Sequence, residues 1–239
     1  MEINKLLDAL AYKYKDNFFA KLLVRPIYRM KVKYEENKRR RFYLLNANSL
    51  LKQIKSSLDN NNCFFWLDFG TLLGAYREKD FIKHDLDLDI GAFYKDAKLV
   101  RKSLLDNGFK ILREYRVGDD GALGLEETYI YKNVTVDVFY FHVEDDVMYC
   151  NTFSPLKDKD ANISLFQVKQ ITVPFTGFSP LIFKDLEFNA PKDVVKHLKA
   201  HYGENFMIPN ANFDYKKEAT NVYWFPKEER IGVYKSFKS

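Results

Sequence analysis

The first sixty residues carry the longest helical pattern of hydrophobic positions. Apolar side chains recur at helical spacing from Leu6 to Leu23. We expect Pro26 to end that helix, because proline lacks the amide hydrogen that a helix interior needs. A second helix is predicted from about Tyr28 to Leu58. The pattern therefore predicts a helical region at 1–60 ahead of a second domain at 61–239.

Beyond residue 60 the chain changes to short runs of β-branched and aromatic residues, which favour strands. The predicted strands are 64–67, 86–93, 109–117, 124–131, 134–141, 147–153, 164–169, 170–175 and 181–183. A helix is predicted over Asp96–Asn107, closed by Gly108. Another is predicted from Asn189 to Tyr202, with Pro191 in its first turn. Irregular structure is expected from Gly203 onward, so the whole pattern predicts an α+β fold.

Three aspartates stand two residues apart at the start of the strand predicted over 86–93. Asp85, Asp87 and Asp89 alternate with leucines, so on a strand their carboxylates share one face. Like charges on one face repel, and Asp is depleted in strands, so the cluster needs a cation. Mg²⁺ or Mn²⁺ is the simplest candidate because both prefer oxygen ligands. For an Asp-x-Asp pair alone, a solvated acidic strand edge is the alternative.

A strand, a tight turn and a helix precede this cluster. Residues 64–67 read as a short buried strand, Gly70 and Thr71 form the turn, and the helical run covers 72–77. Glycine lets a backbone approach a phosphate, and a helix start offers free N–H groups. Asp68, just before the turn, is either a helix cap or a catalytic group. The segment is therefore a candidate phosphate-binding turn.

A third acidic position comes from the strand predicted over 134–141. Asp137 is embedded there among apolar residues, where a carboxylate is costly unless it is paired or bound to a metal. Lys132 and Asn133 are predicted to form a hairpin turn to the preceding strand. We therefore expect Asp137 to lie in the sheet beside the strand of Asp87 and Asp89.

Together these motifs match the signature of the nucleotidyltransferase fold. The amino-acid sequence of residues 70–77 and 81–90 further resembles that of the LicD family, which includes bacterial phosphorylcholine transferases and animal fukutin-related ribitol-phosphate transferases. The resemblance is strong over about 64–93, includes Asp137 by position, and is faint at Tyr202–Gly203. The chain has Lys83–His84 where the family usually has Pro–Trp, which leaves open which group the donor loop accepts.

The resemblance implies a nucleotidyltransferase-like mixed sheet with flanking helices and a metal-dependent phosphotransferase. It implies a CDP-activated donor, transfer of a phosphocholine, phosphoethanolamine or alditol phosphate group to a sugar hydroxyl of a surface glycan such as capsule or lipopolysaccharide, and release of CMP. The metal-binding and catalytic residues would be Asp87, Asp89 and Asp137. The substrate-binding residues would be Gly70, Thr71, Arg77, His84 and Asp85. Arg77 would bind phosphate through its guanidinium or neutralise nearby aspartates. His84 would contact phosphate or be a surface residue. Asp85 would support the other acids from outside the metal site.

Three other functions fit parts of the same pattern. One is transfer of the nucleotide itself to a small molecule. A second is an Asp-x-Asp glycosyltransferase, which explains the metal pair but neither the Gly–Thr turn nor Asp137. A third is a non-catalytic scaffold, which the complete acidic set disfavours.

The basic charge of the chain is concentrated at its start. Residues 1–50 contain 12 Lys or Arg and five Asp or Glu, whereas the rest contains 26 against 28. Lys38–Arg41 is the densest cluster, either a solvated helix face or a contact with anionic membrane. Nucleic acid is not expected as a partner because no recognition motif accompanies the charge.

The remaining features indicate the compartment. The chain start lacks the pattern of a signal peptide, and no apolar run is long enough for a membrane span. Cys63 and Cys150 lack metal-ligand spacing and are expected to be reduced. A cytoplasmic protein is expected, and a lipid-linked acceptor and peripheral contact with the inner membrane face are compatible with this compartment.

Overall fold

The protein is described by a computed structural model that covers residues 18–156, 164–210, 213, 219 and 221–237. The part of the expected first helix that precedes Phe18 lies outside these residues. None of the helices in the described part of the chain has the length and apolar content needed to cross a lipid bilayer.

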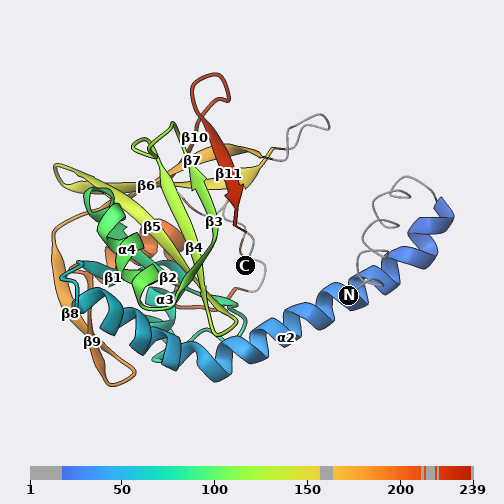
Figure 1. Ribbon diagram of the computed structural model, residues 1–239, viewed down its shortest axis with the longest axis horizontal. Helices are drawn as coiled ribbons and strands as arrows, with labels where there is room; N and C mark the ends of the chain where they lie inside the picture. The colour runs from blue at the N-terminus through green and yellow to red at the C-terminus, as the bar shows by residue number, and fades with distance from the viewer. Residues whose placement is uncertain (1–17, 157–163, 211–212, 214–218, 220, 238–239) are drawn as a thin grey trace.

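A strongly twisted mixed sheet forms the centre of the molecule (Figure 1). Its strands are β1 Phe65–Leu67, β2 Asp87–Phe93, β3 Lys110–Arg116, β4 Leu125–Tyr131, β5 Val134–Glu144, β6 Val147–Pro155, β7 Leu165–Pro174, β8 Phe178–Phe183, β9 Leu186–Pro191, β10 Val222–Trp224 and β11 Ile231–Ser236. Their order is β10-β7-β11-β3-β4-β5-β2-β1-β9-β8, and β6 pairs with both β5 and β7. Because β6 pairs with β5 on one side and β7 on the other, it closes a ring of strands. The ring consists of β3, β4, β5, β6, β7 and β11.

The helices are α2 Phe18–Asp59, α3 Phe69–Leu73, α4 Ala97–Asp106 and α5 Val194–Tyr202, with a π-helical turn η1 at Gly74–Glu78 and a 3₁₀ turn η2 at Tyr94–Asp96. α2 and α4 cover the face of β2 and β5 that carries Leu88 and Ile90, both fully buried. α3 lies against the other face of β2, and α5 packs beside α3. The mixed sheet with flanking helices confirms the predicted α+β fold.

The N-terminal helix differs from the expectation. α2 is one helix of 42 residues with Pro26 inside it, so Pro26 does not end it. Proline removes one backbone hydrogen bond, at a cost of ~3 kcal/mol, and the remaining turns continue on either side. The half nearer Asp59 lies along the sheet, while the other half extends away from it (Figure 1).

Two predictions for the C-terminal part were wrong. Asn189 and Pro191 belong to β9, where the Asn189 side chain donates to the Phe65 carbonyl at 3.0 Å, and the helix begins only after Asp193, whose side chain accepts from the Lys196 amide at 3.1 Å. Proline tolerates this position because it is the last residue of its strand. The segment after Gly203, expected to be irregular, contains β10 and β11, which find partners only in distant strands.

Other predictions hold. Lys132 and Asn133 have φ values of 47° and 66°, the left-handed pair that a two-residue hairpin requires, and they join β4 to β5. α4 ends before Gly108, whose φ of 86° suits a helix terminator. The prediction of two separate strands over 164–169 and 170–175 was wrong, because this segment forms one continuous strand, β7.

Candidate active site

The predicted acids meet on one face of the sheet. β2 and β5 are parallel neighbours, with Asp89 directly opposite Asp137. Asp87 lies two residues before Asp89 and faces the same way, away from Leu88. The structure therefore places the third carboxylate in the strand next to the acidic strand, as the sequence predicted.

Gly70 and Thr71 lie in the first turn of α3 instead of in a turn ahead of the helix, and both are bonded to this acidic strand. The Gly70 amide donates to Asp89 Oδ2 at 2.9 Å, and the Asp89 amide donates to Thr71 Oγ1 at 2.8 Å. A Cβ atom on Gly70 would lie 2.9 Å from Asp85 Oδ2 and 3.0 Å from Asp89 Oδ2. Two carboxylates thus converge above Gly70, and only glycine leaves room for them.

The charges of the cluster are incompletely compensated. Burial and then Asp87 raise the pKa of Asp85 to about 7, and the same two causes raise the pKa of Asp137 to about 6. Burial, followed by the charges of the other three acids, raises the pKa of Asp89 well above its usual value. Burial also raises the pKa of Asp87. Several half-buried carboxylates that lack enough cations are a donor set that fits a hard divalent metal ion.

Three polar residues beside Asp137 were missed in the sequence. Thr128 on β4 lies opposite Asp137 and donates a hydrogen bond to Asp137 Oδ1. Arg113 on β3 donates to Thr128 Oγ1 at 2.8 Å and lies 3.8 Å from Asp137 Oδ1. Glu126 lies on the same face, and burial followed by Asp137 raises its pKa to about 8. Thr128 could have been predicted from the hairpin at Lys132–Asn133. Counting residues outward from a two-residue turn pairs Thr128 with Asp137.

A cavity of about 660 Å³ opens beside the cluster. It brings together Gly70, Arg77, His84 and Asp85, four of the five residues predicted to bind substrate. The fifth, Thr71, is buried. The other residues of the cavity wall are Leu73, Ile82, Tyr202, Asn205, Phe206, Ile208, Pro209, Asn210 and Phe213.

Arg77 is held in place at the cavity by two contacts. Its Nη1 donates to the Phe206 carbonyl at 2.9 Å, and its Nε donates to Glu78 at 2.9 Å. Its positive charge also lowers the pKa of Asp85, against the larger effects of burial and Asp87. The cavity therefore has an acidic end at Asp85 and a cation fixed on its wall.

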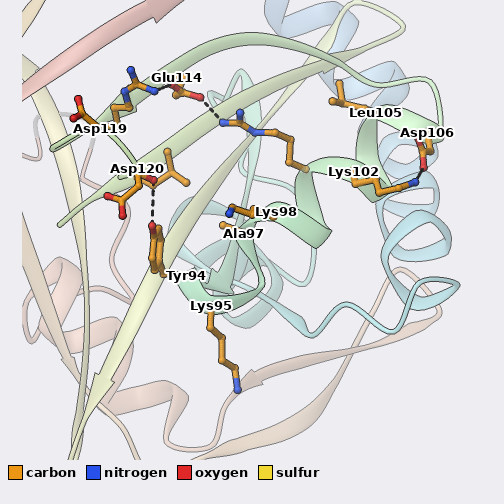
Figure 2. A pocket seen from close by; sticks show the side chains of 13 residues that line it. Tyr94, Lys95, Ala97, Lys98, Lys102, Leu105, Asp106, Glu114, Asp119 and Asp120 are labelled. Carbon is orange, nitrogen blue, oxygen red and sulfur yellow. Dashed lines mark hydrogen bonds and ion pairs between the residues drawn. The ribbon is translucent and has the colours of Figure 1, made fainter. Parts of the chain in front are cut away.

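A second cavity, of about 670 Å³, lies between α4 and β3 and contains none of the predicted site residues (Figure 2). Several of its charged side chains form ion pairs. Arg101 bridges Glu114 and Glu127, and Lys102 pairs with Asp106. We interpret this cavity as a surface feature of the α4 packing, and the acidic cluster as the site of chemistry.

Asp68 belongs to a buried group that sequence reasoning did not find. Its Oδ1 lies 2.7 Å from His197 Nε2 and 3.8 Å from His201 Nε2, and all three side chains are fully buried. Their ligand atoms lie within 4.8 Å of one another, an arrangement that could hold a metal ion. Asp68 also caps α3 by accepting from the Phe69 amide at 2.8 Å and accepts from the Trp66 indole at 2.8 Å. The helix-cap alternative for Asp68 is thus the one observed, and the i, i+4 spacing of the two histidines was the available signal.

Comparison with known proteins gives one family match. The family model described as LicD/FKTN/FKRP, nucleotidyltransferase domain, matches residues 62–193, more than half of the chain. The chain is 29% identical over 179 residues to ribitol-5-phosphate transferase FKTN of Homo sapiens, an alignment that covers 74% of this chain and 36% of that protein. It is 29% identical over 161 residues to an uncharacterized protein of Rickettsia prowazekii, covering 67% of this chain and 55% of the relative. The chain thus spans little more than a third of the human protein's length.

Proposed function

Because this chain belongs to the LicD/FKTN/FKRP nucleotidyltransferase family, we propose that it transfers a phosphate-containing group from a nucleotide-activated donor to a glycan. The donor we propose is CDP-activated, and the group transferred is of the phosphocholine, phosphoethanolamine or alditol phosphate type. The human relative's name specifies ribitol 5-phosphate, which makes an alditol phosphate one of the groups to test first.

One observation supports this proposal most directly. Asp89 and Asp137 lie side by side on parallel strands, with Asp87 on the same face and Asp85 at the wall of a 660 Å³ cavity. This arrangement offers carboxylate oxygens at one end and a volume suited to a small-molecule donor beside them.

In the proposed reaction Asp87, Asp89 and Asp137 hold Mg²⁺ or Mn²⁺, which supplies charge neutralisation for phosphate oxygens. Gly70 and Thr71 fix Asp89 in position through the two hydrogen bonds described above. Arg77, anchored by Phe206, presents its guanidinium to phosphate in the cavity, and His84, which lines the same cavity, contacts the donor. Asp137 or its neighbour Glu126 accepts the proton of the attacking sugar hydroxyl.

The proposed acceptor is a glycan, and a lipid-linked glycan at the inner membrane face would give the basic residues 1–50 a use as a peripheral contact with anionic lipid. Sedimentation with anionic vesicles measures that contact, which should weaken as salt is raised.

Product analysis tests the reaction class. The protein is incubated with CDP-choline, CDP-ethanolamine or CDP-ribitol, a sugar acceptor and Mg²⁺, and nucleotides are separated by chromatography. We expect CMP, formed only with metal, and a loss of about 100-fold or more in Asp89→Asn. Asp119→Asn, which removes an exposed acid of the second cavity, is the matched control and should retain full activity.

Other products would identify the alternative reactions. Release of CDP would indicate a glycosyl-type transfer, and release of the phospho-substituent with CMP bound to the acceptor would indicate nucleotide transfer. No product from any donor, with Mg²⁺ and Mn²⁺ both tried, would support a scaffold. Equal CMP formation by Asp89→Asn and the unmodified protein would contradict the assigned site.

A further inference from the structure

Four aromatic side chains gather on strands that contribute no residue to the 660 Å³ cavity. These four residues, which we call the aromatic group, are Tyr115 on β3, Phe153 on β6, Phe166 on β7 and Tyr234 on β11. The Tyr115 ring stacks on Phe153 at a centroid distance of 5.4 Å and meets Phe166 edge-on at 5.0 Å. The Tyr234 ring lies 5.1 Å from Tyr115 and 5.5 Å from Phe166. The four rings therefore form one contiguous apolar surface.

The aromatic group lies on the same face of the sheet as the acids. Asp137, Thr128 and Arg113 are register partners across β5, β4 and β3, and hydrogen bonds join their side chains in that order. Tyr115 comes two residues after Arg113 and so shares its face, where it lies opposite Tyr234 of β11. Neighbouring strands are about 4.8 Å apart, which puts β3 roughly 10 Å from β5. A sugar residue can span such a distance, so the aromatic group is within one sugar of Asp137.

The backbone beneath the rings is shaped to hold them. A Cβ atom on Gly232 of β11 would lie 2.4 Å from Cδ1 of Phe153, so only glycine leaves room for that ring. Phe166 is the register partner of Gly232. All four rings are half-buried, and each therefore keeps part of its surface open to solvent while its neighbours fix its position. A surface that is fixed before a ligand arrives loses little entropy on binding.

The two tyrosines of the aromatic group differ from the tyrosines of the core. Tyr129 and Tyr140 are fully buried, and both hydroxyls donate to Glu127. Among the described residues, the hydroxyls of Tyr115 and Tyr234 have no hydrogen-bond partner. Phenylalanine would serve equally well for packing alone, whereas a tyrosine hydroxyl at a solvated surface can bond a ligand.

The acids lie between the cavity and the aromatic group. The cavity wall comes from α3, η1, the segment before β2 and the end of α5 with the segment after it. In the strand order, β2 and β5 carry the acids, and β4 separates them from β3 and β11. The attacking and leaving oxygens of a phosphoryl transfer lie roughly in line with phosphorus. With the nucleotide in the cavity, the attacking hydroxyl therefore approaches from the side of the aromatic group.

We propose that the aromatic group is the subsite for the acceptor sugar, with Tyr115 and Tyr234 as its binding residues. One face of a pyranose ring presents mainly C–H groups, which pack against aromatic rings, and its edge presents hydroxyls, which bond the tyrosine hydroxyls. The role of this sugar as acceptor rests on the proposed function, whereas the binding of a sugar does not.

Saturation-transfer NMR tests sugar binding to the full chain without any reaction. The probes are the methyl β-glycosides of glucose, galactose and N-acetylglucosamine. We expect at least one of them to bind. Tyr234→Phe should weaken that binding by about 2- to 10-fold through loss of one hydrogen bond, and Tyr234→Leu by about 10-fold or more through loss of the ring as well. The matched control Tyr34→Leu removes a tyrosine that is 66% exposed on the half of α2 extending away from the sheet, and it should bind normally (Figure 1).

Turnover supplies a second readout. Tyr234→Leu should raise the KM of the sugar acceptor by the same factor as it weakens binding, and leave the KM of the CDP-activated donor unchanged. If CMP is formed and the group is transferred while both Tyr234 variants keep the acceptor KM of the unmodified protein, the proposed function stands and this inference is wrong. If sugar binding depends on Tyr234 but no CDP-activated donor yields CMP, the subsite stands and the proposed reaction is wrong.

Melting temperatures separate sugar binding from packing. A Tyr234→Leu variant that melts at a lower temperature yet binds the sugars normally would show that the rings only hold β11 on β3, and would overturn the proposal. So would an equal loss of binding in Tyr34→Leu, or the failure of all three sugars to bind the unmodified protein. If Tyr234→Leu does not fold, Tyr234→Phe decides, because it keeps the ring in place; unchanged sugar affinity in that variant would then overturn the proposal.

Discussion

At the scale of single residues, the cluster around Asp137 concentrates negative charge where the protein alone does not neutralise it. The Asp137 side chain is 13% exposed and receives a hydrogen bond from Thr128, yet its pKa is raised to about 6 by burial and Asp87. The folded, metal-free protein therefore binds a proton at Asp137 that the unfolded chain, with an ordinary aspartate pKa of 3.8, has already released.

This difference predicts a pH dependence of stability in the metal-free protein. Between about pH 4 and pH 6 the folded state holds more protons than the unfolded state, so stability falls as pH rises through this window. Asp137→Asn removes this contribution. In thermal unfolding with a chelator present, the melting temperature of the variant should rise relative to that of the unmodified protein as pH rises from 4 to 7. The relative rise should be on the order of a few degrees. Taking the difference between the two proteins cancels titrating groups outside the cluster, while Asp89 and Glu126, whose pKa values Asp137 raises, change in the same direction. A constant difference across this range would contradict the assignment, and added Mg²⁺ should reduce the gain.

At the scale of elements, the buried Asp68 group joins α5 to the turn that supports the acids. Asp68 accepts hydrogen bonds from Trp66, from the Phe69 amide and from His197, so one carboxylate links β1, α3 and α5. Burial acts to raise the pKa of Asp68, but the charge and hydrogen bond of His197 hold it below its usual value. Burial lowers the pKa of His201 to about 3, so that ring stays neutral. We interpret the group as a clamp that fixes Gly70 and the acidic strand.

Replacement of His197 tests the clamp. His197→Ala removes a donor from a fully buried carboxylate and should lower the free energy of unfolding by about 2–4 kcal/mol. Lys196→Ala, at the exposed neighbouring position on α5, is the control and should change it little. Chemical denaturation measures both. A chelator-sensitive melting temperature in the unmodified protein, absent in His197→Ala, would show instead that the group binds a metal ion.

At the scale of the whole molecule, the half of α2 nearer Asp59 is part of the same core as the sheet. Leu51, Ile54 and Leu58 are fully buried together with residues of β2, β5 and α4. The division at residue 60 stays a prediction about folding units, but these side chains would be left without partners if the two parts were separated.

Substitution within α2 tests this packing. Leu51→Ala should destabilise the protein by about 2–5 kcal/mol, because it leaves a cavity in the core. Leu45→Ala, at a position that is 72% exposed on the same helix, should have little effect. A fragment of residues 61–239 is expected to remain unfolded. If that fragment gave a cooperative transition at the temperature of the full chain, the helix would be dispensable for folding.

Much of the site was predictable because its determinants are local. The alternation of Asp87 with Leu88 sets which face carries acids, and the left-handed pair Lys132–Asn133 sets the register that brings Thr128 to Asp137. His197 was not predictable in this way, since its contact with Asp68 spans 129 residues and depends on how α5 docks. Pro191 was misassigned because proline suits both a first helical turn and a strand end.

The sequence by itself therefore determined the acidic strand, the hairpin that carries Asp137 and the family to which they belong, because periodicity and turn chemistry act over a few residues. Only the tertiary structure decided that β10 and β11 complete the sheet and that His197 and His201 lie beside Asp68. These features depend on contacts between distant segments and on the angle at which a helix meets the sheet, and no local pattern of residues specifies either.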